Sequence, residues 1–257
     1  MKASIVIANY NNEKFISECL NSLNSQTHKD NEIIFFDDNS SDNSTKIAEK
    51  FSNIKIIKND IKTNFSTFNQ MNAFKKAVEI STGEIIFFLD SDDFFHENKI
   101  EKITNIFLKE KEKVVIFDFP IILEKNRVTK QKKKNKIFKT YWDYIHPTSC
   151  ISVRKSIIND IFDYINVKKF ENTWMDFRIH LYAKYINNNF KILNENLTYY
   201  RRHSESATSK FTKISKSWWK RRSEAHDYFH YFAEKNNLKI KKNYDYVITK
   251  ILYKFIQ

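Results

Sequence analysis

The sequence predicts an α/β protein with a Rossmann-like central mixed sheet, flanked by helices and followed by a C-terminal helical extension. Short apolar runs alternate with segments of helical periodicity through the first 120 residues, a pattern typical of a mostly parallel sheet. Polar and acidic residues directly follow three of these runs, which is where open α/β sheets bind ligands. Beyond residue 210, apolar residues recur at helical spacing among Lys and Arg.

The N-terminal third is expected to alternate strands and helices. Clusters of β-branched and aromatic residues predict strands at 3–8, 31–36 and 54–58, and the segments 13–25 and 44–51 read as helices between them. A helix at 68–80 precedes Gly83, the only glycine of the chain, and the apolar run 84–89 is expected to be a buried central strand.

The middle of the chain carries weaker signals. We expect a helix at 97–111, then a strand at 113–119 that leads through Pro120 into a basic loop or irregular hairpin at 125–139. An apolar segment at 149–153, a helix at 174–187 and a short strand at 190–193 follow. We divide the chain into three parts, at 1–120, 121–210 and 211–257.

Composition bounds the class of protein. With 257 residues, 41% hydrophobic and 16% aromatic, the chain is long and apolar enough to bury the core of an enzyme-sized protein. Cys19 and Cys150 have no metal-ligand spacing and form no disulfide framework, so we expect a cytoplasmic protein. No run approaches the roughly 20 apolar residues that cross a bilayer, so any membrane contact is expected to be peripheral.

Two carboxylates lie one residue apart in Asp90-Ser91-Asp92, at the end of the predicted buried strand. Such a pair can face a divalent cation that replaces their mutual repulsion with coordination, and hard oxygen ligands suit Mn²⁺ or Mg²⁺. A cation bridging two phosphates would neutralise charge on a nucleoside-diphosphate leaving group. Taken alone, this motif is more often an acidic surface loop than a metal site.

Three ordered segments extend that reading, because each ends a predicted strand. They are SIVIANYN from residue 4, EIIFFDDNSSD from residue 32 and TGEIIFFLDSDD from residue 82. Together they resemble the family 2 glycosyltransferases of the GT-A fold, well over residues 1–120 and more weakly to about residue 208. The resemblance implies a nucleotide-sugar-binding half at 1–120, an acceptor-binding half at 121–210 and a basic, aromatic extension at 211–257.

What the resemblance implies is an inverting glycosyltransferase that depends on Mn²⁺ or Mg²⁺. Such an enzyme moves a sugar from a nucleotide-diphosphate donor, with UDP as the expected nucleotide, to a hydroxyl of a glycan or lipid-linked acceptor. Bacterial surface glycans, lipopolysaccharide or capsule, are the products we expect from the resemblance. The reaction would take place in the cytoplasm, at the inner face of the cell membrane.

The resemblance also assigns donor contacts. Ala8 and Tyr10 close the first strand, and the aromatic ring is expected to stack on the base. Asp38 matches a carboxylate that binds the base, with Asp37 beside it, although this segment equally reads as a turn and helix cap. Asp90 and Ser91 are expected on the nucleotide, and Asp92 as the direct metal ligand.

A closing element is expected near residue 200. Arg201, Arg202 and His203 resemble the family's segment that folds over the diphosphate, and Arg suits phosphate through its forked donors. His203 could reach either phosphate or metal. The alternative is a basic surface loop.

An acceptor hydroxyl needs a carboxylate to take its proton as it attacks the anomeric carbon. Asp176 is the predicted base, because residues 172–178 resemble the family's acidic segment at the start of a late helix. The usual Glu-Asp pair is absent, so Glu171 stays open, and Asp176 at a helix start could instead complement the helix dipole. His146 is expected to contact the acceptor.

One departure concerns the diphosphate. Family members commonly carry an Arg-Asn-x-Gly element before the Asp-x-Asp strand, and residues 68–76 here contain neither that Arg nor that Gly. Lys75 or Lys76 could supply a charge but not bidentate phosphate binding.

Two other classes compete with this interpretation. Paired aspartates also occur in Mg²⁺-dependent nucleotidyltransferases and phosphatases. A net charge of +13 and the aromatic, basic C-terminus are compatible with a nucleic-acid-binding protein, although no nucleic-acid motif appears and we expect no nucleic-acid partner.

The C-terminal segment carries two open hypotheses. The first is peripheral membrane contact, with Trp218 and Trp219 at the interface and neighbouring Lys and Arg on anionic headgroups. The second is a pair of helices that packs on the catalytic domain or forms a dimer contact.

Overall fold

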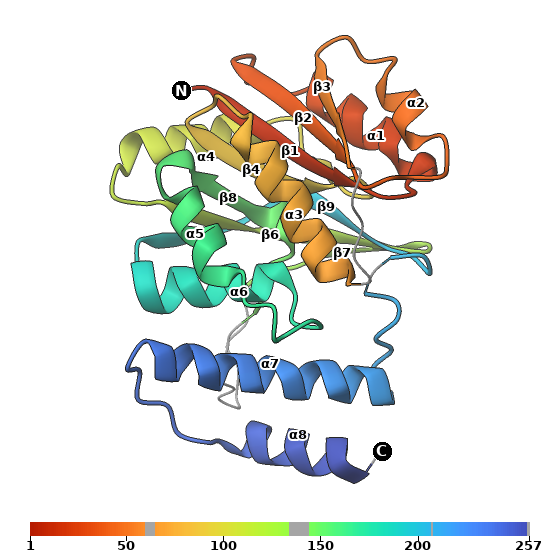
Figure 1. Ribbon diagram of the computed structural model, residues 1–257. Coiled ribbons are helices and arrows are strands. Elements are labelled where there is room, and N and C mark those ends of the chain that lie inside the picture. The colour runs from red at the N-terminus through yellow and green to blue at the C-terminus, as the bar shows by residue number, and fades with distance from the viewer. Residues whose placement is uncertain (60–64, 134–143, 207, 256–257) are drawn as a thin grey trace.

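A computed structural model describes residues 1–59, 65–133, 144–206 and 208–255 of the chain, and its main body is one mixed sheet between two layers of helices (Figure 1). The strand order is β3-β2-β1-β4-β8-β6-β9-β5, and β7 pairs with β6. This confirms the predicted α/β class with a Rossmann-like mixed sheet.

The first four strands are parallel and form the half of the sheet that the sequence predicted best. They are β1 (Ala3–Asn9), β2 (Asn31–Asp37), β3 (Ile54–Lys58) and β4 (Ile85–Asp90). The other strands are β5 (Phe94–Phe95), β6 (Val115–Glu124), β7 (Arg127–Lys130), β8 (Ile151–Arg154) and β9 (Phe190–Arg202). Because β4 pairs antiparallel with β8, direction reverses next to β4.

Helices cover both faces of the sheet. One core contains side chains of α1 (Glu13–Asn24), α2 (Ser44–Ala48) and α4 (Lys99–Lys109), and the other contains those of α3 (Ser66–Glu79), α5 (Ile158–Ile165) and α6 (Met175–Tyr182). Alternate residues of β1 and β4 serve the two cores: Val6 and Phe88 belong to one, Ile7 and Leu89 to the other. Period-two alternation in fully apolar strands therefore fills two cores at once.

Strand β5 was not predicted, and three longer elements also differ from expectation. Strand β6 continues through Pro120. Its register with β9 shifts at this point, so the N–H that proline lacks falls at an irregularity of the ladder. Asn196 Nδ2 donates to the Pro120 carbonyl at 3.1 Å. Strand β9 has 13 residues instead of the four predicted. Helix α5 was not predicted, although Ile158, Ile161, Phe162 and Ile165 have helical spacing.

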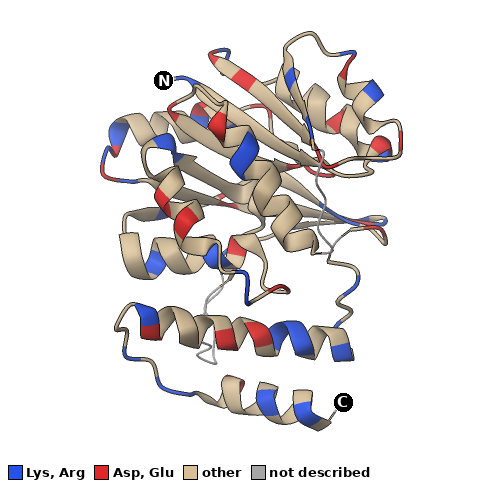
Figure 2. Ribbon diagram, in the orientation of Figure 1, with Lys and Arg blue, Asp and Glu red and all other residues tan. Residues whose placement is uncertain are grey.

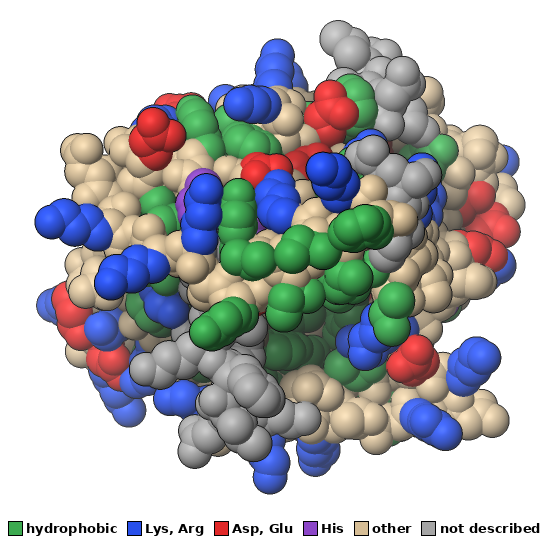
Figure 3. All heavy atoms as spheres, turned by 90° about the horizontal axis from the view of Figure 1, so that it is seen from below, with side chains coloured by type: hydrophobic (Ala, Val, Ile, Leu, Met, Phe, Trp, Pro, Cys, Tyr) green, Lys and Arg blue, Asp and Glu red, His purple; other side chains and the backbone are tan. Residues whose placement is uncertain are grey.

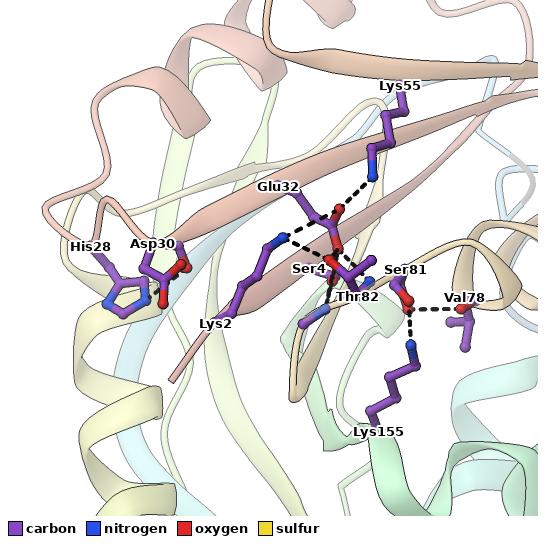
Figure 4. A network of polar contacts seen from close by, with 11 residues as sticks. Lys2, Ser4, His28, Asp30, Glu32, Lys55, Val78, Ser81, Thr82 and Lys155 are labelled. Carbon is purple, nitrogen blue, oxygen red and sulfur yellow. Dashed lines mark hydrogen bonds and ion pairs between the residues drawn. The ribbon is translucent and has the colours of Figure 1, made fainter.

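The edge of the sheet opposite the strands' carboxyl ends is tied together by Glu32 of β2 (Figure 4). Its carboxylate accepts hydrogen bonds from Ser4 Oγ at 2.7 Å and Thr82 Oγ1 at 2.8 Å, and it pairs with Lys55 at 2.8 Å. Burial opposes ionisation of Glu32, but these bonds hold its pKa well below the usual value. The turn that contains Thr82 also requires glycine at position 83. A Cβ at Gly83 would lie 2.7 Å from the backbone of Ala3, so any other side chain would force strand β1 to move.

The C-terminal extension consists of α7 (Lys216–Lys235) and α8 (Tyr244–Phe255). Ser215 caps α7 by accepting a hydrogen bond from the backbone N–H of Trp218. Tyr228, Phe229 and Phe232 of α7 pack on Phe177 and Leu181 of α6 in a third apolar cluster. The extension is thus packed on the α/β body, in line with the second of the two hypotheses for this segment.

Trp218 and Trp219 are half-buried on α7, with ring centroids 4.6 Å apart, and Arg222 lies over Trp218. Among the described residues, none of the helices is long and apolar enough to span a membrane. The division at residue 120 stays a prediction about function, because β6 runs across it; residues 134–139 of the predicted basic stretch lie outside the described ranges.

Candidate functional site

The carboxyl ends of β1, β2 and β4 bring the three sequence motifs to one edge of the sheet. Ala8 lies between Phe36 of β2 and Asp90 of β4 in the parallel register, and Asn9 is opposite Asp37. Residues that are distant in sequence are adjacent here because parallel strands end on the same side.

The loop after β1 is held by Asn9, a residue to which the sequence assigned no role. Its amide donates to Asp37 Oδ1 at 2.9 Å and to Ser44 Oγ at 2.9 Å. Asn11 then adopts a left-handed conformation, with φ of 51°. Tyr10, between them, has 47% of its surface exposed.

The two aspartates that end β2 have different environments. Asp37 accepts hydrogen bonds from the Ser40 hydroxyl at 2.6 Å and backbone N–H at 3.1 Å, and so shapes the turn before α2. Asp38 accepts a hydrogen bond from Asn59 Nδ2 at 2.6 Å, just beyond β3. Asp37 therefore has the structural role of the turn, and the nucleotide role of Asp38 stays a prediction.

Gln70 of α3 occupies the region of the missing Arg-Asn-x-Gly element. Its amide donates to Asp90 Oδ1 at 2.7 Å. Lys75 and Lys76 lie more than a helical turn further along α3, away from its N-terminal end. Gln70 of α3 thus brings a neutral amide to the acidic loop, and no motif in the sequence singled it out.

The acidic loop after β4 concentrates negative charge. Burial, and then the charge of Asp92, raise the pKa of Asp90 to about 8, which the hydrogen bond from Gln70 partly offsets. The charge of Asp176 also contributes to that raised pKa, so the predicted base and the Asp-x-Asp lie close together. Ser91 Oγ accepts a hydrogen bond from Asn12 Nδ2 at 2.7 Å, which connects the loop to the start of α1.

Asp92 and His203, both predicted metal ligands, are in contact. His203 Nε2 lies 2.9 Å from Asp92 Oδ2, and the ring packs against Phe15 with centroids 4.6 Å apart. Within the described ranges, no cluster of three His, Cys, Asp or Glu side chains forms a metal site. A carboxylate with one imidazole fits a cation that takes its remaining ligands from phosphate and water, as Mg²⁺ does in nucleotide enzymes.

Asp93 fixes this loop to two other parts of the chain. It is fully buried and accepts hydrogen bonds from Ser149 Oγ at 2.6 Å and from the Arg201 backbone N–H at 2.9 Å. Ser149 Oγ in turn accepts from the Asp90 backbone N–H at 3.0 Å. Below it, the buried Lys99 ammonium donates to the Ser149 carbonyl and to Asp118.

Arg201, Arg202 and His203 line one hollow of about 390 Å³, together with basic residues of the β6–β7 hairpin. Arg201 donates to the Asp92 carbonyl at 3.1 Å, pairs with Glu18, and lies over the rings of Phe15 and Phe94. Arg202 is half exposed and lies 3.6 Å from Glu124. Both already have carboxylate partners, and contact with a diphosphate stays a prediction.

Asp176 lies in the first turn of α6, as predicted, and a residue of the C-terminal extension faces it. Burial raises the pKa of Asp176 to about 7, and the nearby Arg221 charge opposes this rise. The Arg221 guanidinium lies 4.2 Å over the Trp174 ring, and its Nε donates to the Asn172 carbonyl at 3.2 Å. Helix α7 therefore contributes a cation beside the candidate base.

Glu224, one turn along α7, secures the loop that precedes the candidate base. Its Oε1 accepts hydrogen bonds from the backbone N–H groups of Asn172 and Thr173 at 2.6 and 2.9 Å, and its Oε2 accepts from the Asn172 amide at 2.7 Å. Glu171, the alternative base, is exposed. These hydrogen bonds fix residues 172 and 173, which directly precede α6 and Asp176.

His146 is 1% exposed, with Nδ1 2.7 Å from the Asp118 carbonyl, and it packs against Phe117 and Phe119. Burial lowers its pKa to about 4, so the ring is neutral near pH 7. It lies beneath the surface, and direct contact with an acceptor stays a prediction.

Comparison with known proteins decides the family. The model of glycosyl transferase family 2 matches residues 4–163, more than half of the chain and all three strand-end motifs. The chain belongs to glycosyl transferase family 2. This confirms the resemblance on which the predicted GT-A fold and site were based.

Relatives and solved structures agree with this membership. The chain is 31% identical over 216 residues to an uncharacterized glycosyltransferase of Nostoc sp., covering 79% of this chain and 65% of that protein. It is 31% identical over 219 residues to the Escherichia coli UDP-Glc:α-D-GlcNAc-diphosphoundecaprenol β-1,3-glucosyltransferase WfaP, covering 82% of each. It thus spans just under two thirds of the length of the Nostoc relative.

A crystal structure of S. aureus TarS 1-349 in complex with UDP-GlcNAc has the same fold. It superposes with a TM-score of 0.66 at 19% identity, over 100% of this chain and 71% of that one.

Replacing Ser149 by Ala should lower the free energy of unfolding by about 1.5–3 kcal/mol, since a buried carboxylate loses a hydrogen-bond donor. Ser152→Ala is the matched control: Ser152 is as fully buried, three residues away, and its hydroxyl has no partner in the part of the chain that the structure describes. Urea unfolding would measure both. Equal effects of the two substitutions would contradict the role given to Ser149.

Proposed function

We propose that this protein is an inverting glycosyltransferase that transfers a sugar from a UDP-linked donor to a hydroxyl of a glycan or lipid-linked acceptor. The observation that carries the proposal is the grouping, at one sheet edge, of the Asp92–His203 pair, Asp90 and a carboxyl group, Asp176, whose pKa is raised to about 7. Family membership gives this grouping its interpretation.

The donor's parts are assigned to the ends of the parallel strands. Tyr10 stacks on the base and Asp38 accepts a hydrogen bond from it, with Ala8 beneath the nucleoside. Asp90 and Ser91 face the ribose. Arg201, Arg202 and His203, which line one basic hollow, face the diphosphate.

Asp92 and His203 would hold Mn²⁺ or Mg²⁺, and a bound cation supplies charge neutralisation for the departing nucleoside diphosphate. Asp176 accepts the proton of the acceptor hydroxyl while that oxygen forms a bond to the anomeric carbon. The bond from that carbon to the diphosphate oxygen breaks with its electron pair, and the configuration inverts. Gln70 and Asn12 keep the acidic loop in place through Asp90 and Ser91.

The relatives support a choice of acceptor class. WfaP acts on a diphosphoundecaprenol-linked sugar, and a lipid-linked intermediate of a bacterial surface glycan is the acceptor we assign here. Such an acceptor places the reaction at the cytoplasmic face of the cell membrane. Both cysteines are free and buried, which suits a reducing compartment.

The chief test is release of nucleoside diphosphate from UDP-, GDP- and CDP-linked sugars, with Mn²⁺ or with EDTA. The wild type should release UDP in the presence of the metal. Asp92→Ala should lower the rate at least about a hundredfold, because even partners of metal ligands cost 10–100-fold when lost.

Asp30→Ala, at the opposite edge of the sheet, is the control and should leave the rate unchanged. Release of pyrophosphate instead would identify a nucleotidyltransferase, and release of inorganic phosphate a phosphatase. Release of UDP that is the same in EDTA would contradict the metal dependence.

The pH dependence of kcat/KM tests the role of Asp176. Since the base acts when deprotonated, activity should fall as the pH drops through about 7. The groups that face Asp176 are Arg221 of α7, Asp90 of β4, Tyr200 of β9 and Tyr144. Arg221→Met removes the cation that favours the carboxylate, so the acid limb should move to higher pH.

Arg222→Met is the matched control, because the adjacent Arg222 pairs with Asp245 of α8 instead. It should keep the wild-type acid limb. Asp176→Asn should lower kcat by about 10²–10⁴-fold at every pH. An acid limb that stays in place in Arg221→Met would argue against the assignment of Asp176.

A further inference from the structure

Helix α8 presents an apolar stripe to solvent. Tyr244, Ile248, Ile251 and Phe255 recur at helical spacing, and their exposed fractions are 88%, 52%, 48% and 81%. Val247, 44% exposed, widens the stripe at one side. Figure 3 shows hydrophobic side chains gathered on this face of the molecule. Scattered apolar residues on a surface are ordinary, but a continuous stripe along one helix marks an interaction surface.

The opposite side of α8 is already in use. Thr249 is buried and accepts a hydrogen bond from Arg222 at 3.2 Å, and Lys250 pairs with Asp227 of α7 at 2.6 Å. These polar contacts with α7 fix the orientation of the helix. The apolar stripe points away from the protein body because the polar side is the one that is anchored.

Positive charge surrounds the stripe. Residues 211–257 contain eleven Lys and Arg against four Asp and Glu. Lys239, Lys241 and Lys242 are exposed in the segment before α8, and Lys254 is exposed beside Phe255. Figure 2 shows the basic residues on both C-terminal helices and on the segment that joins them.

We propose that the outer face of α8 binds an anionic lipid surface, with the apolar stripe in the interface and the surrounding lysines on the headgroups. A helix with an apolar face and flanking Lys lies in the plane of a membrane, and each cation near an anionic surface adds to the attraction. A second copy of the chain on the same face would bring the same lysines together, so charge disfavours a dimer. This inference does not depend on the proposed reaction.

The location differs from the earlier hypothesis for this segment. Trp218 and Trp219 were expected at the interface, but both are half-buried on α7, where Arg221 lies over Trp174 and Arg222 pairs with Asp245. The residues free to meet lipid are those of the α8 stripe.

The test is flotation of the full chain with vesicles of equal parts phosphatidylcholine and phosphatidylglycerol, and with vesicles of phosphatidylcholine alone. The wild type should float with the mixed vesicles only, and added salt should weaken binding. The double variant Ile248→Asp/Ile251→Asp should reduce the bound fraction by at least about tenfold, because it places two charges in the apolar stripe.

Ile80→Asp/Leu108→Asp is the matched control, since it adds the same charges at exposed apolar positions on α4 and at the end of α3. It should float as the wild type does. A second set removes charge only: Lys241→Gln/Lys242→Gln/Lys254→Gln should weaken binding, and Lys29→Gln/Lys46→Gln/Lys50→Gln should not.

Three outcomes would overturn the proposal. They are no flotation of the wild type, equal flotation of the two Asp double variants, and a dimer in sedimentation analysis that Ile248→Asp/Ile251→Asp dissociates. Circular dichroism of each variant excludes unfolding as the cause. Because flotation needs no donor or acceptor, its outcome is separate from that of the transfer assay.

Discussion

The site depends on the two hydrogen bonds that Asp93 accepts from Ser149 and from the backbone of Arg201. Asp93 ends the loop after the central strand β4, Ser149 precedes β8, and Arg201 belongs to β9. One buried carboxylate therefore joins the half of the sheet that carries the three strand-end motifs to β9, which His203 directly follows. Together with the pairing of β5 with β9, this junction brings residue 203 to residue 92 across more than a hundred positions of sequence.

The junction needs several hydrogen bonds because it buries neighbouring carboxylates. Asp90, Asp92 and Asp93 follow one another within four residues, and burial and mutual repulsion raise the pKa values of Asp90 and Asp93. Hydrogen bonds from Gln70, Ser149 and the Arg201 backbone offset part of that cost, as Arg221 does at Asp176. The arrangement concentrates carboxylates whose pKa values are raised at the point to which we assign the cation and the proton transfer, and perturbed pKa values of this kind are common in active sites. Helix α7 is part of the extension and also contributes Arg221 and Glu224 to the surroundings of Asp176.

Much of this could be predicted from the sequence because the strand-end motifs are local. Strands β1 to β4 and residues Asp90, Asp92 and Asp176 fall where apolar runs end or helices begin, and parallel pairing then brings most of them together. The family resemblance suggested that His203 reaches the metal or the diphosphate, and the structure adds its contact with Asp92. The roles of Gln70, Ser149 and Arg221 could not be predicted, because each depends on contacts between distant segments, and an amide, a hydroxyl or a guanidinium has many ordinary uses. The length of β9 was missed for the same reason. Its pairing with β6 stabilises it as a strand, whereas its polar residues do not have the pattern of one.

The composition of the C-terminal extension did not predict how its residues are used. Its tryptophans and arginines are interleaved in a way that suits a membrane surface, yet the fold uses them to pack α7 on the body and to reach Asp176. The most direct test of the account is anomalous diffraction from crystals grown with Mn²⁺ and UDP. We expect one manganese peak between the Asp92 carboxylate and the His203 ring, in contact with the diphosphate. Bound UDP with no peak there, or a peak held by other side chains, would contradict it.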